Sequence, residues 1–316
     1  MNDDEERMAE HWREQRDRRR QRREFFRALA AVAGVGGGLN MALSVVPANA
    51  QTVSDADVLN FALNLEYLEA QFYSYAVNGV GLSNSDLSGT GNQGAVIGGR
   101  KVNFTDPIVE QYAREIAADE VAHVKFLRAQ LGSAAVAQPA IDVGTAIDGA
   151  FSSAARAAGL IGPGESFDPY ASDENFLLGA FIFEDVGVTA YKGAAPLITN
   201  ATYLEAAAGI LAVEAYHAGI VRTTLYAKGI ETPSLRTSAD KISDARDSLD
   251  GTSDLDQGIS PQADTSNIVP LDANGIAFSR TTGQVLNIAY LSKAAAGSGG
   301  FFPAGVNGTI NMSAAN

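Results

Sequence analysis

Two histidines of this chain each follow a glutamate by three residues within an apolar segment. The pairs are Glu120 with His123 in REIAADEVAHVKFL and Glu214 with His217 in ILAVEAYHAGIVR. Positions i and i+3 of an α-helix are neighbours on one face, so each pair points a carboxylate and an imidazole at the same packing partner. Carboxylate and imidazole are metal-ligating groups, and two such pairs can form one metal site.

Two other apolar segments each carry a glutamate followed seven residues later by a tyrosine. They are Glu66 with Tyr73 in NLEYLEAQFY and Glu184 with Tyr191 in FEDVGVTAY. Seven residues are about two helical turns, so each pair shares one stripe of its helix. The tyrosines are candidates to donate hydrogen bonds to metal ligands or to supply electrons in oxygen chemistry, and ordinary core tyrosine is the alternative.

Glu69 competes with Glu66 for the first ligand position, but only Glu66 has a tyrosine at +7. Oxygen and imidazole donors suit iron or manganese, with zinc as an alternative. A metal-free cluster would bury four carboxylates at a cost of several kcal/mol per unneutralised charge, a penalty that two dications largely remove. The predicted ligands are Glu66, Glu120, His123, Glu184, Glu214 and His217.

Asp119 and Asp185 adjoin predicted ligands in the sequence. One residue along a helix turns a side chain by about 100°. We therefore expect both aspartates on solvated faces.

Start and stop signals predict four long helices that carry these residues. The first runs from a Ser54 cap to Gly79, and the second from Thr105-Asp106-Pro107 to Gly132. The third starts at Ser172 and is stopped by Pro196, and the fourth runs from about Asn200 to Gly229. Residues 79–103 read as a long irregular connection with room for a short hairpin, and 139–170 as a connection with a short helix near 145–158.

The first 50 residues resemble an export signal. Arg22-Arg23 precede a weakly apolar run that ends in Ala48-Asn49-Ala50, which predicts a twin-arginine signal cleaved after Ala50. The predicted partner is the twin-arginine export machinery, and the predicted location is the periplasm or the exterior. A basic arm or an uncleaved anchor is the alternative.

The predicted mature chain is strongly acidic. The whole chain has 23 Lys plus Arg and 37 Asp plus Glu. The signal holds 9 and 8 of these, which leaves 14 against 29 and a net charge of −15. Such a charge argues against nucleic acid or an anionic membrane as a partner and favours the binding of metal cations. A homo-oligomer is compatible with it.

The ligand pattern is similar to that of the ferritin-like superfamily of dinuclear carboxylate bundles. Three segments resemble the ferritin-like domain family that includes twin-arginine-exported bacterial members and plant desiccation-related proteins: LNFALNLEYLEAQFYSYAV, NIVPLDANGIAFSRTTGQVLNIAYL and GGFFPAGVNGTI. The resemblance spans nearly all of residues 54–312. It implies an all-α ferritin-like four-helix bundle over 51–232 with long connections. The sequence itself predicts that residues 233–316 form a C-terminal extension of the same domain, with a helix near 241–249 and enough large apolar side chains to pack on the bundle.

The resemblance also implies roles for the ligands. Glu66 and His123 would bind one metal ion, Glu184 and His217 the other, and Glu120 and Glu214 would bridge them. The implied cofactor is two iron ions, or manganese. The implied activity is that of a ferroxidase or peroxide-detoxifying protein acting on O2 or peroxide, with a dimanganese catalase as a variant. A non-catalytic desiccation- or stress-related protein with a structural metal site is the alternative from a different class.

Overall fold

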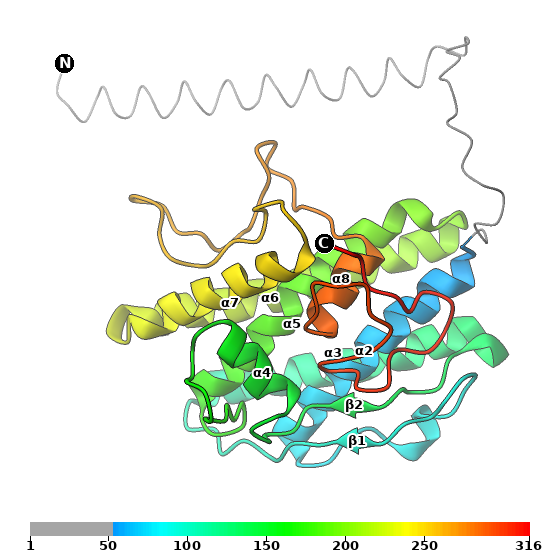
Figure 1. The fold of residues 1–316 in the computed structure, drawn as a ribbon, viewed down its shortest axis with the longest axis horizontal. Helices are drawn as coiled ribbons and strands as arrows, with labels where there is room; N and C mark the ends of the chain where they lie inside the picture. The colour runs from blue at the N-terminus through cyan, green and yellow to red at the C-terminus, as the bar shows by residue number, and fades with distance from the viewer. Residues whose placement is uncertain (1–52) are drawn as a thin grey trace, which may run out of the picture. The chain divides into compact units, whose positions relative to one another are not determined.

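The computed structural model describes residues 53–316, and four long helices make up most of its regular structure (Figure 1). They are α2 (Asp55–Asn78), α3 (Pro107–Leu131), α5 (Asp173–Ala194) and α6 (Ala201–Glu231). Each begins at a predicted cap: Ser54 forms a capping box with Asp57, and Asp106, Ser172 and Asn200 accept amide hydrogen bonds at the other three starts. The export signal predicted for residues 1–50 lies outside the described residues.

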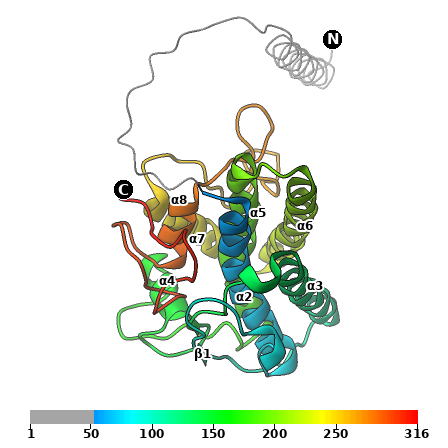
Figure 2. The same ribbon diagram turned by 90° about the vertical axis from the view of Figure 1, so that its right-hand side faces the viewer.

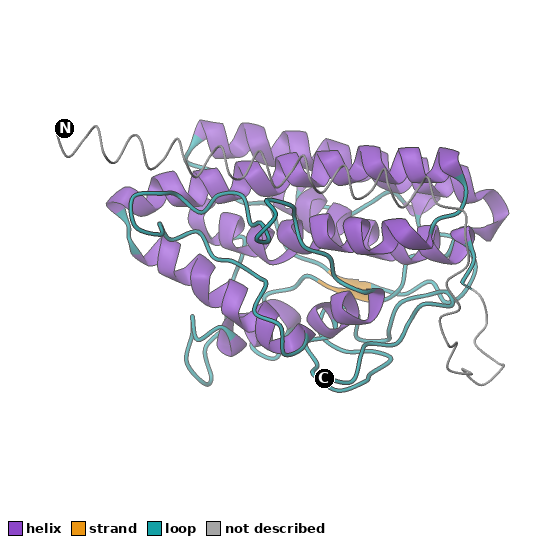
Figure 3. Ribbon diagram, turned by 90° about the horizontal axis from the view of Figure 1, so that it is seen from above, coloured by secondary structure: helices purple, strands orange, loops and turns teal. Residues whose placement is uncertain are grey.

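The four helices pack as two pairs, α2 with α3 and α5 with α6, and the pairs meet mainly along α2 and α5. The stripe between them is filled by aromatic rings. Phe72 of α2 lies 5.7 Å from the ring of Phe176 and 5.6 Å from that of Phe183, both on α5. Figure 3 shows how completely helices dominate this part of the chain, so the predicted all-α class is confirmed.

The C-terminal extension packs on the bundle, as predicted. It contains α7 (Ser234–Asp250) and α8 (Thr282–Ala289), which contact α5. Figure 2 shows α3 and α6 on one side of the α2 and α5 pair, and α7 and α8 on the other. Phe301 of the tail is 1 % exposed, and its ring contacts those of Phe151 and Phe183. Helix α7 begins earlier than the predicted 241–249, because Pro233 ends the connection from α6 and starts the next helix at once.

The prediction of a short hairpin within residues 79–103 is wrong. This segment, which contains a 3-10 turn at Asn84–Asp86, pairs in parallel with the segment after α3, through β1 (Val96–Ile97) and β2 (Ile141–Asp142). Gly94 makes the close approach possible, because a Cβ there would lie 2.1 Å from the amide nitrogen of Ala140. The connection after β2 contains α4 (Ala150–Ala157), at the position of the predicted short helix.

Helix α6 is long and apolar enough to cross a membrane by length and composition alone, and it is the one such helix found in residues 53–316. Its inward face carries Glu214 and His217, both buried in the groups of carboxylates and histidines between the long helices. These charges face the bundle interior, so the apolar composition of α6 fits a helix of the bundle.

The turn Leu271–Ile276 forms a unit separate from Val53–Pro270 and Ala277–Asn316. Within it, the amide of Asp272 donates to the carbonyl of Ile276 at 2.8 Å.

Candidate metal centre

Helices α2, α3, α5 and α6 bring the six predicted ligands together inside the bundle, where each is at most 9 % exposed. They form two groups, and within each group one ligand atom per residue lies within 4.8 Å of all the others. The first group is Glu66, Glu120, His123 and Glu214, and the second is Glu120, Glu184 and His217. Glu120 belongs to both groups, whereas Glu214 belongs to the first alone.

Many of these donor atoms have no hydrogen-bond partner within residues 53–316. Both oxygens of Glu120, both oxygens of Glu214, Oε2 of Glu184 and Nδ1 of His217 are buried and unsatisfied. Buried polar atoms are normally paired, because leaving one unpaired costs about 1–3 kcal/mol and more for a charged group. Nδ1 of His217 lies only 3.0 Å from Oε1 of Glu120, without hydrogen-bond geometry. Carboxylate oxygens and an imidazole nitrogen that lie close together without hydrogen-bond partners are suited to bind cations between them.

Burial and crowding shift the protonation of the carboxylates. Burial, followed by the charge of Glu120, raises the pKa of Glu66 to about 7. Burial raises the pKa of Glu184, and raises that of Glu214 well above its ordinary value with the help of Glu69. Burial would also raise the pKa of Glu120, but the two histidines lower it to about 2.

The pKa values of both histidines are also raised, but by neighbouring carboxylates and not by burial. Burial would lower the pKa of His123, but contacts with Glu120 and Glu66 raise it to about 10. Burial would likewise lower the pKa of His217, but Glu184 and Glu120 raise it to about 12. Protons on the two histidines therefore offset the carboxylate charges when no metal is bound, and a bound metal ion would displace these protons.

We expect the metal-free protein to lose stability as the pH rises from about 5 to about 12. Glu66, His123 and His217 have pKa values above their unfolded values of 4.5 and 6.5, so their contribution is complete at low pH and disappears as the pH passes the folded pKa. Glu120 behaves oppositely, but its contribution is lost only below pH 4.5. Thermal unfolding of chelator-treated protein across this range measures the effect, and a metal-free midpoint that rises from pH 6 to pH 9 would contradict it.

Tyr73 and Tyr191 each donate a hydrogen bond to a glutamate on the other helix pair. The hydroxyl of Tyr73 on α2 donates to Oε1 of Glu184 on α5, and that of Tyr191 on α5 donates to Oε1 of Glu66 on α2. Each bond fixes one carboxylate oxygen and leaves the other directed at the centre. Burial raises the pKa of both phenols well above its ordinary value, so both remain protonated donors.

Asp119 orients His217. Its Oδ2 lies 3.2 Å from Nε2 of His217, on the ring edge opposite Nδ1. The expectation of a solvated-face acid is thus only half right, because the Asp119 side chain is 43 % exposed yet contacts the imidazole. The sequence does not show this contact, since it joins α3 to α6. By accepting the Nε2 proton, Asp119 leaves the lone pair of Nδ1 free to bind a metal ion.

Replacing Asp119 by asparagine should weaken metal binding by about 10- to 100-fold, the usual cost of losing the carboxylate that orients a ligating histidine. Titration of metal-free protein with Mn²⁺ or Fe²⁺ measures the affinity. Glu115→Gln removes a charge from an exposed position of the same helix and serves as the control. Equal affinities in the two variants would show that Asp119 is only a surface charge.

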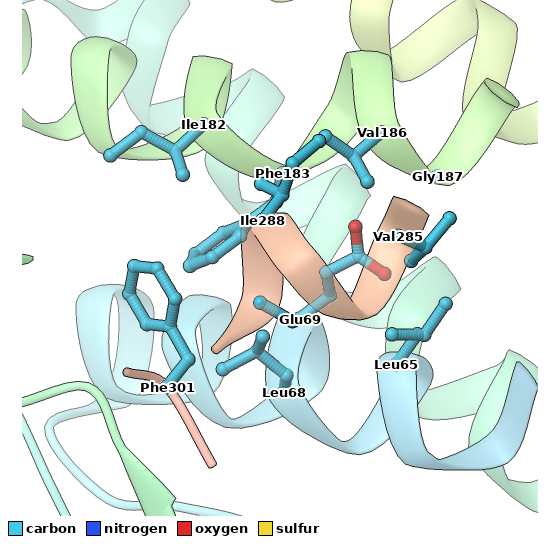
Figure 4. Close-up of a pocket in the computed structure, with 11 residues that line it drawn as sticks. Leu65, Leu68, Glu69, Ile182, Phe183, Val186, Gly187, Val285, Ile288 and Phe301 are labelled. Atoms are coloured by element: carbon cyan, nitrogen blue, oxygen red, sulfur yellow. The ribbon is translucent and has the colours of Figure 1, made fainter. Parts of the chain in front are cut away.

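Glu69 lies outside both ligand groups, whereas Oε2 of Glu66 is 3.1 Å from Nδ1 of His123. Glu69 instead lines a cavity on the α8 side of the centre (Figure 4). It is 5 % exposed, and burial, followed by the charge of Glu120, raises its pKa well above the ordinary value.

Asp185 is buried, so its expected place on a solvated face is wrong. It turns away from the centre and accepts from Arg222 at 2.8 Å and from Arg246 at 2.9 Å. The network continues through Asp256 and Arg280 to Asp250, with each arginine at most 2 % exposed. It thus joins α5 and α6 to the C-terminal extension directly beside the ligands.

Known proteins share this sequence pattern. Over 167 residues the chain is 32 % identical to the desiccation-related protein PCC13-62 of Craterostigma plantagineum, an alignment that covers 51 % of this chain and 50 % of that protein. Over 280 residues it is 26 % identical to the ferritin-like catalase Nec2 of Nesocodon mauritianus, covering 85 % of this chain and 88 % of that protein. No solved structure matches the chain significantly.

The family model described as "Ferritin-like domain" matches residues 54–227. The matched region begins at the cap of α2 and includes all six predicted ligands and both tyrosines. It makes up more than half of the chain, and the protein belongs to the ferritin-like domain family.

Proposed function

We propose that this protein binds two redox-active metal ions, iron or manganese, in the candidate centre and uses them to consume hydrogen peroxide. The observation that carries the proposal is the set of buried carboxylate and imidazole atoms without hydrogen-bond partners. The similarity to a protein named ferritin-like catalase, which extends over most of both chains, supports the choice of peroxide.

The residues divide between two ion positions. Glu66 and His123 would hold one ion and Glu184 and His217 the other, with Glu120 shared because it belongs to both groups. Glu214 belongs to the first group alone, and it would bridge if one of its two unpaired oxygens turned toward the second position. When bound, two adjacent redox-active ions exchange the electrons needed to convert two molecules of hydrogen peroxide into two of water and one of dioxygen.

The protein residues hold and move protons around this chemistry. Burial raises the pKa values of Glu184 and Glu214, which favours their protonated forms and makes them candidates to accept protons. The hydroxyls of Tyr73 and Tyr191 fix the orientation of two ligands. The surrounding aromatic and aliphatic core excludes bulk water, which limits side reactions of peroxide.

Metal analysis followed by an oxygen-electrode assay tests this proposal. We expect two metal equivalents per chain and dioxygen release on addition of peroxide, in a ratio of one dioxygen to two peroxides. Stopped-flow addition of Fe(II) under air measures ferroxidase activity in the same preparation. Fe(II) oxidation without peroxide turnover would assign the centre to a ferroxidase instead.

A structural metal centre is the second candidate. The ligands come from both helix pairs, so bound ions would tie α2 and α3 to α5 and α6. The similarity to a desiccation-related protein favours this role. Two metal equivalents with neither peroxide turnover nor Fe(II) oxidation would establish it.

We also propose that the protein acts in the bacterial periplasm or outside the cell after cleavage following Ala50. The twin arginines Arg22 and Arg23 and the Ala48-Asn49-Ala50 end support export. Cell fractionation with N-terminal sequencing tests it, and retention of the Arg22→Lys, Arg23→Lys double variant in the cytoplasm is the expected control. An intact N-terminus on the exported protein would contradict the cleavage site.

A further inference from the structure

An apolar cavity borders the candidate metal centre on the side of the C-terminal extension. It has a volume of about 30 Å³ and lies between α2, α5 and α8, with Phe301 at one end (Figure 4). Leu68, Val186, Val285 and Ile288 contribute side chains to its wall. About 10–15 Å³ of this measure holds one water molecule, so the cavity has room for a small diatomic ligand.

Glu69 is the one ionisable side chain among the residues that line the cavity. Its carboxyl group points from α2 toward α5 (Figure 4), and a Cβ built at Gly187 would lie 3.4 Å from its Oε1. Burial, followed by the charge of Glu120, raises the pKa of this group well above its ordinary value, which favours its protonated form. Every other residue that lines the cavity is apolar.

Gly187 separates the cavity from the metal ligands. It lines the cavity, and a Cβ built at this position would lie 2.2 Å from Oε2 of Glu214 and 3.4 Å from Oε1 of Glu69. Any side chain at residue 187 would therefore collide with the carboxylate of Glu214. The absence of a side chain there leaves Glu214 directly behind the cavity wall.

The opposite side of the centre is polar. The His123 side chain is 11 % exposed and that of Asp119 is 43 % exposed, on the α3 side that α7 and α8 leave uncovered (Figure 2). Peroxide hydrogen-bonds at both ends, so transfer into an apolar chamber would cost it those bonds. Dioxygen makes no such bonds, and apolar protein cavities bind small apolar gases such as xenon.

We propose that the cavity beside Glu69 and Gly187 is a binding chamber for dioxygen, separate from the polar side by which peroxide would approach. The biological use of this chamber rests on the proposed function, whereas the binding of dioxygen to the cavity does not depend on it. The chamber takes dioxygen either as the product of peroxide turnover or as a substrate drawn from solution.

Xenon binding to the full-length mature protein tests the chamber without any activity measurement. We expect xenon under pressure to occupy this cavity in a crystal, and ¹²⁹Xe NMR to report the same site with and without metal. Ala289→Leu fills the cavity from α8 and should lower xenon affinity at least tenfold. The matched control, Ala62→Leu, places the same side chain in a different apolar pocket, next to Val58 and Ala190, and should leave this site unchanged.

Two results would overturn the proposal. One is ordered water rather than xenon in the wild-type cavity, a measurement that does not depend on any variant folding. The other is undiminished xenon binding at this position in folded Ala289→Leu. Either can occur while peroxide turnover is normal, and xenon binding can persist in a protein without turnover, so the chamber and the proposed function fail separately.

Kinetics of the same variant identify the source of the dioxygen. If the chamber receives product, Ala289→Leu should lower kcat for peroxide and leave KM unchanged. If it supplies substrate, the variant should raise the KM for dioxygen during Fe(II) oxidation. A variant that lacks xenon binding but matches wild type in both assays would show that the cavity does not serve dioxygen.

Discussion

Replacing Glu120 by alanine should release both metal ions and abolish peroxide turnover. Glu120 is the residue common to the two ligand groups, and both of its oxygens are buried without hydrogen-bond partners. Its removal takes a donor from each ion position at once and leaves His123 and His217 without their nearest shared carboxylate. Elemental analysis should show metal falling from two equivalents to near zero.

A graded series makes this prediction specific. His217→Ala removes a donor from the second group alone, so it should release one ion more readily than the other. Glu115→Ala removes a carboxylate from an exposed position of α3, five residues from Glu120, and should keep both ions. Circular dichroism confirms that each variant is folded. Full metal content in both Glu120→Ala and His217→Ala would show that the ions, if any, bind elsewhere.

The candidate ligands could be selected from the sequence because each choice depends on local helical geometry. Glu120 with His123 and Glu214 with His217 share a face through i,i+3 spacing alone, and the helix limits follow from caps such as Ser54 and Asp106. The preference for Glu66 over Glu69 likewise came from a repeated spacing, Glu to Tyr at +7. These patterns lie within single helices, where sequence distance translates directly into position.

The contacts that were missed join residues far apart in the chain. Asp119 reaches His217 across 98 positions, and Asp185 meets Arg246 across 61. Position next to a candidate ligand predicts a side chain turned by about 100° toward solvent, but for Asp185 the C-terminal extension covers that direction. The parallel pairing of 79–103 with the segment after α3 is equally non-local, since nothing in either segment specifies the other.

Replacing Arg246 by methionine should destabilise the protein by about 3–5 kcal/mol, the typical cost of breaking a buried ion pair from one side. Arg246 is 2 % exposed, donates to Asp256 at 2.8 and 2.9 Å and to Asp185 at 2.9 Å, and also bonds the carbonyl of Phe181. Its loss leaves two buried carboxylates short of a partner. For a chain of this size the melting temperature should fall by about 10 °C.

The matched control is Arg114→Met, which breaks an exposed i,i+4 pair with Glu110 and should cost about 0.5 kcal/mol or less. Acid should reduce the difference between wild type and Arg246→Met. Burial would raise the pKa of Asp256, but Arg246 and Arg280 outweigh it and hold that pKa below 3.8. The stabilisation from Asp256 is therefore present above pH 3.8 and disappears as the pH falls through its folded pKa.

Hydrogen exchange should locate the damage in the C-terminal extension. Arg246 lies on α7 and its partner Asp185 on α5, while Arg280, just before α8, bonds Asp250, Asp256 and the Thr189 hydroxyl. The backbone of Arg280 sits so close to α5 that a Cβ at Gly193 would lie 1.8 Å from its carbonyl oxygen. In Arg246→Met we expect faster exchange in α7 and α8 than in α2 and α3. Because α8 forms one wall of the cavity beside Glu69, the xenon affinity of Arg246→Met should also fall. If hydrogen exchange were equally fast in all helices and the melting temperature were unchanged, the network would not stabilise the extension.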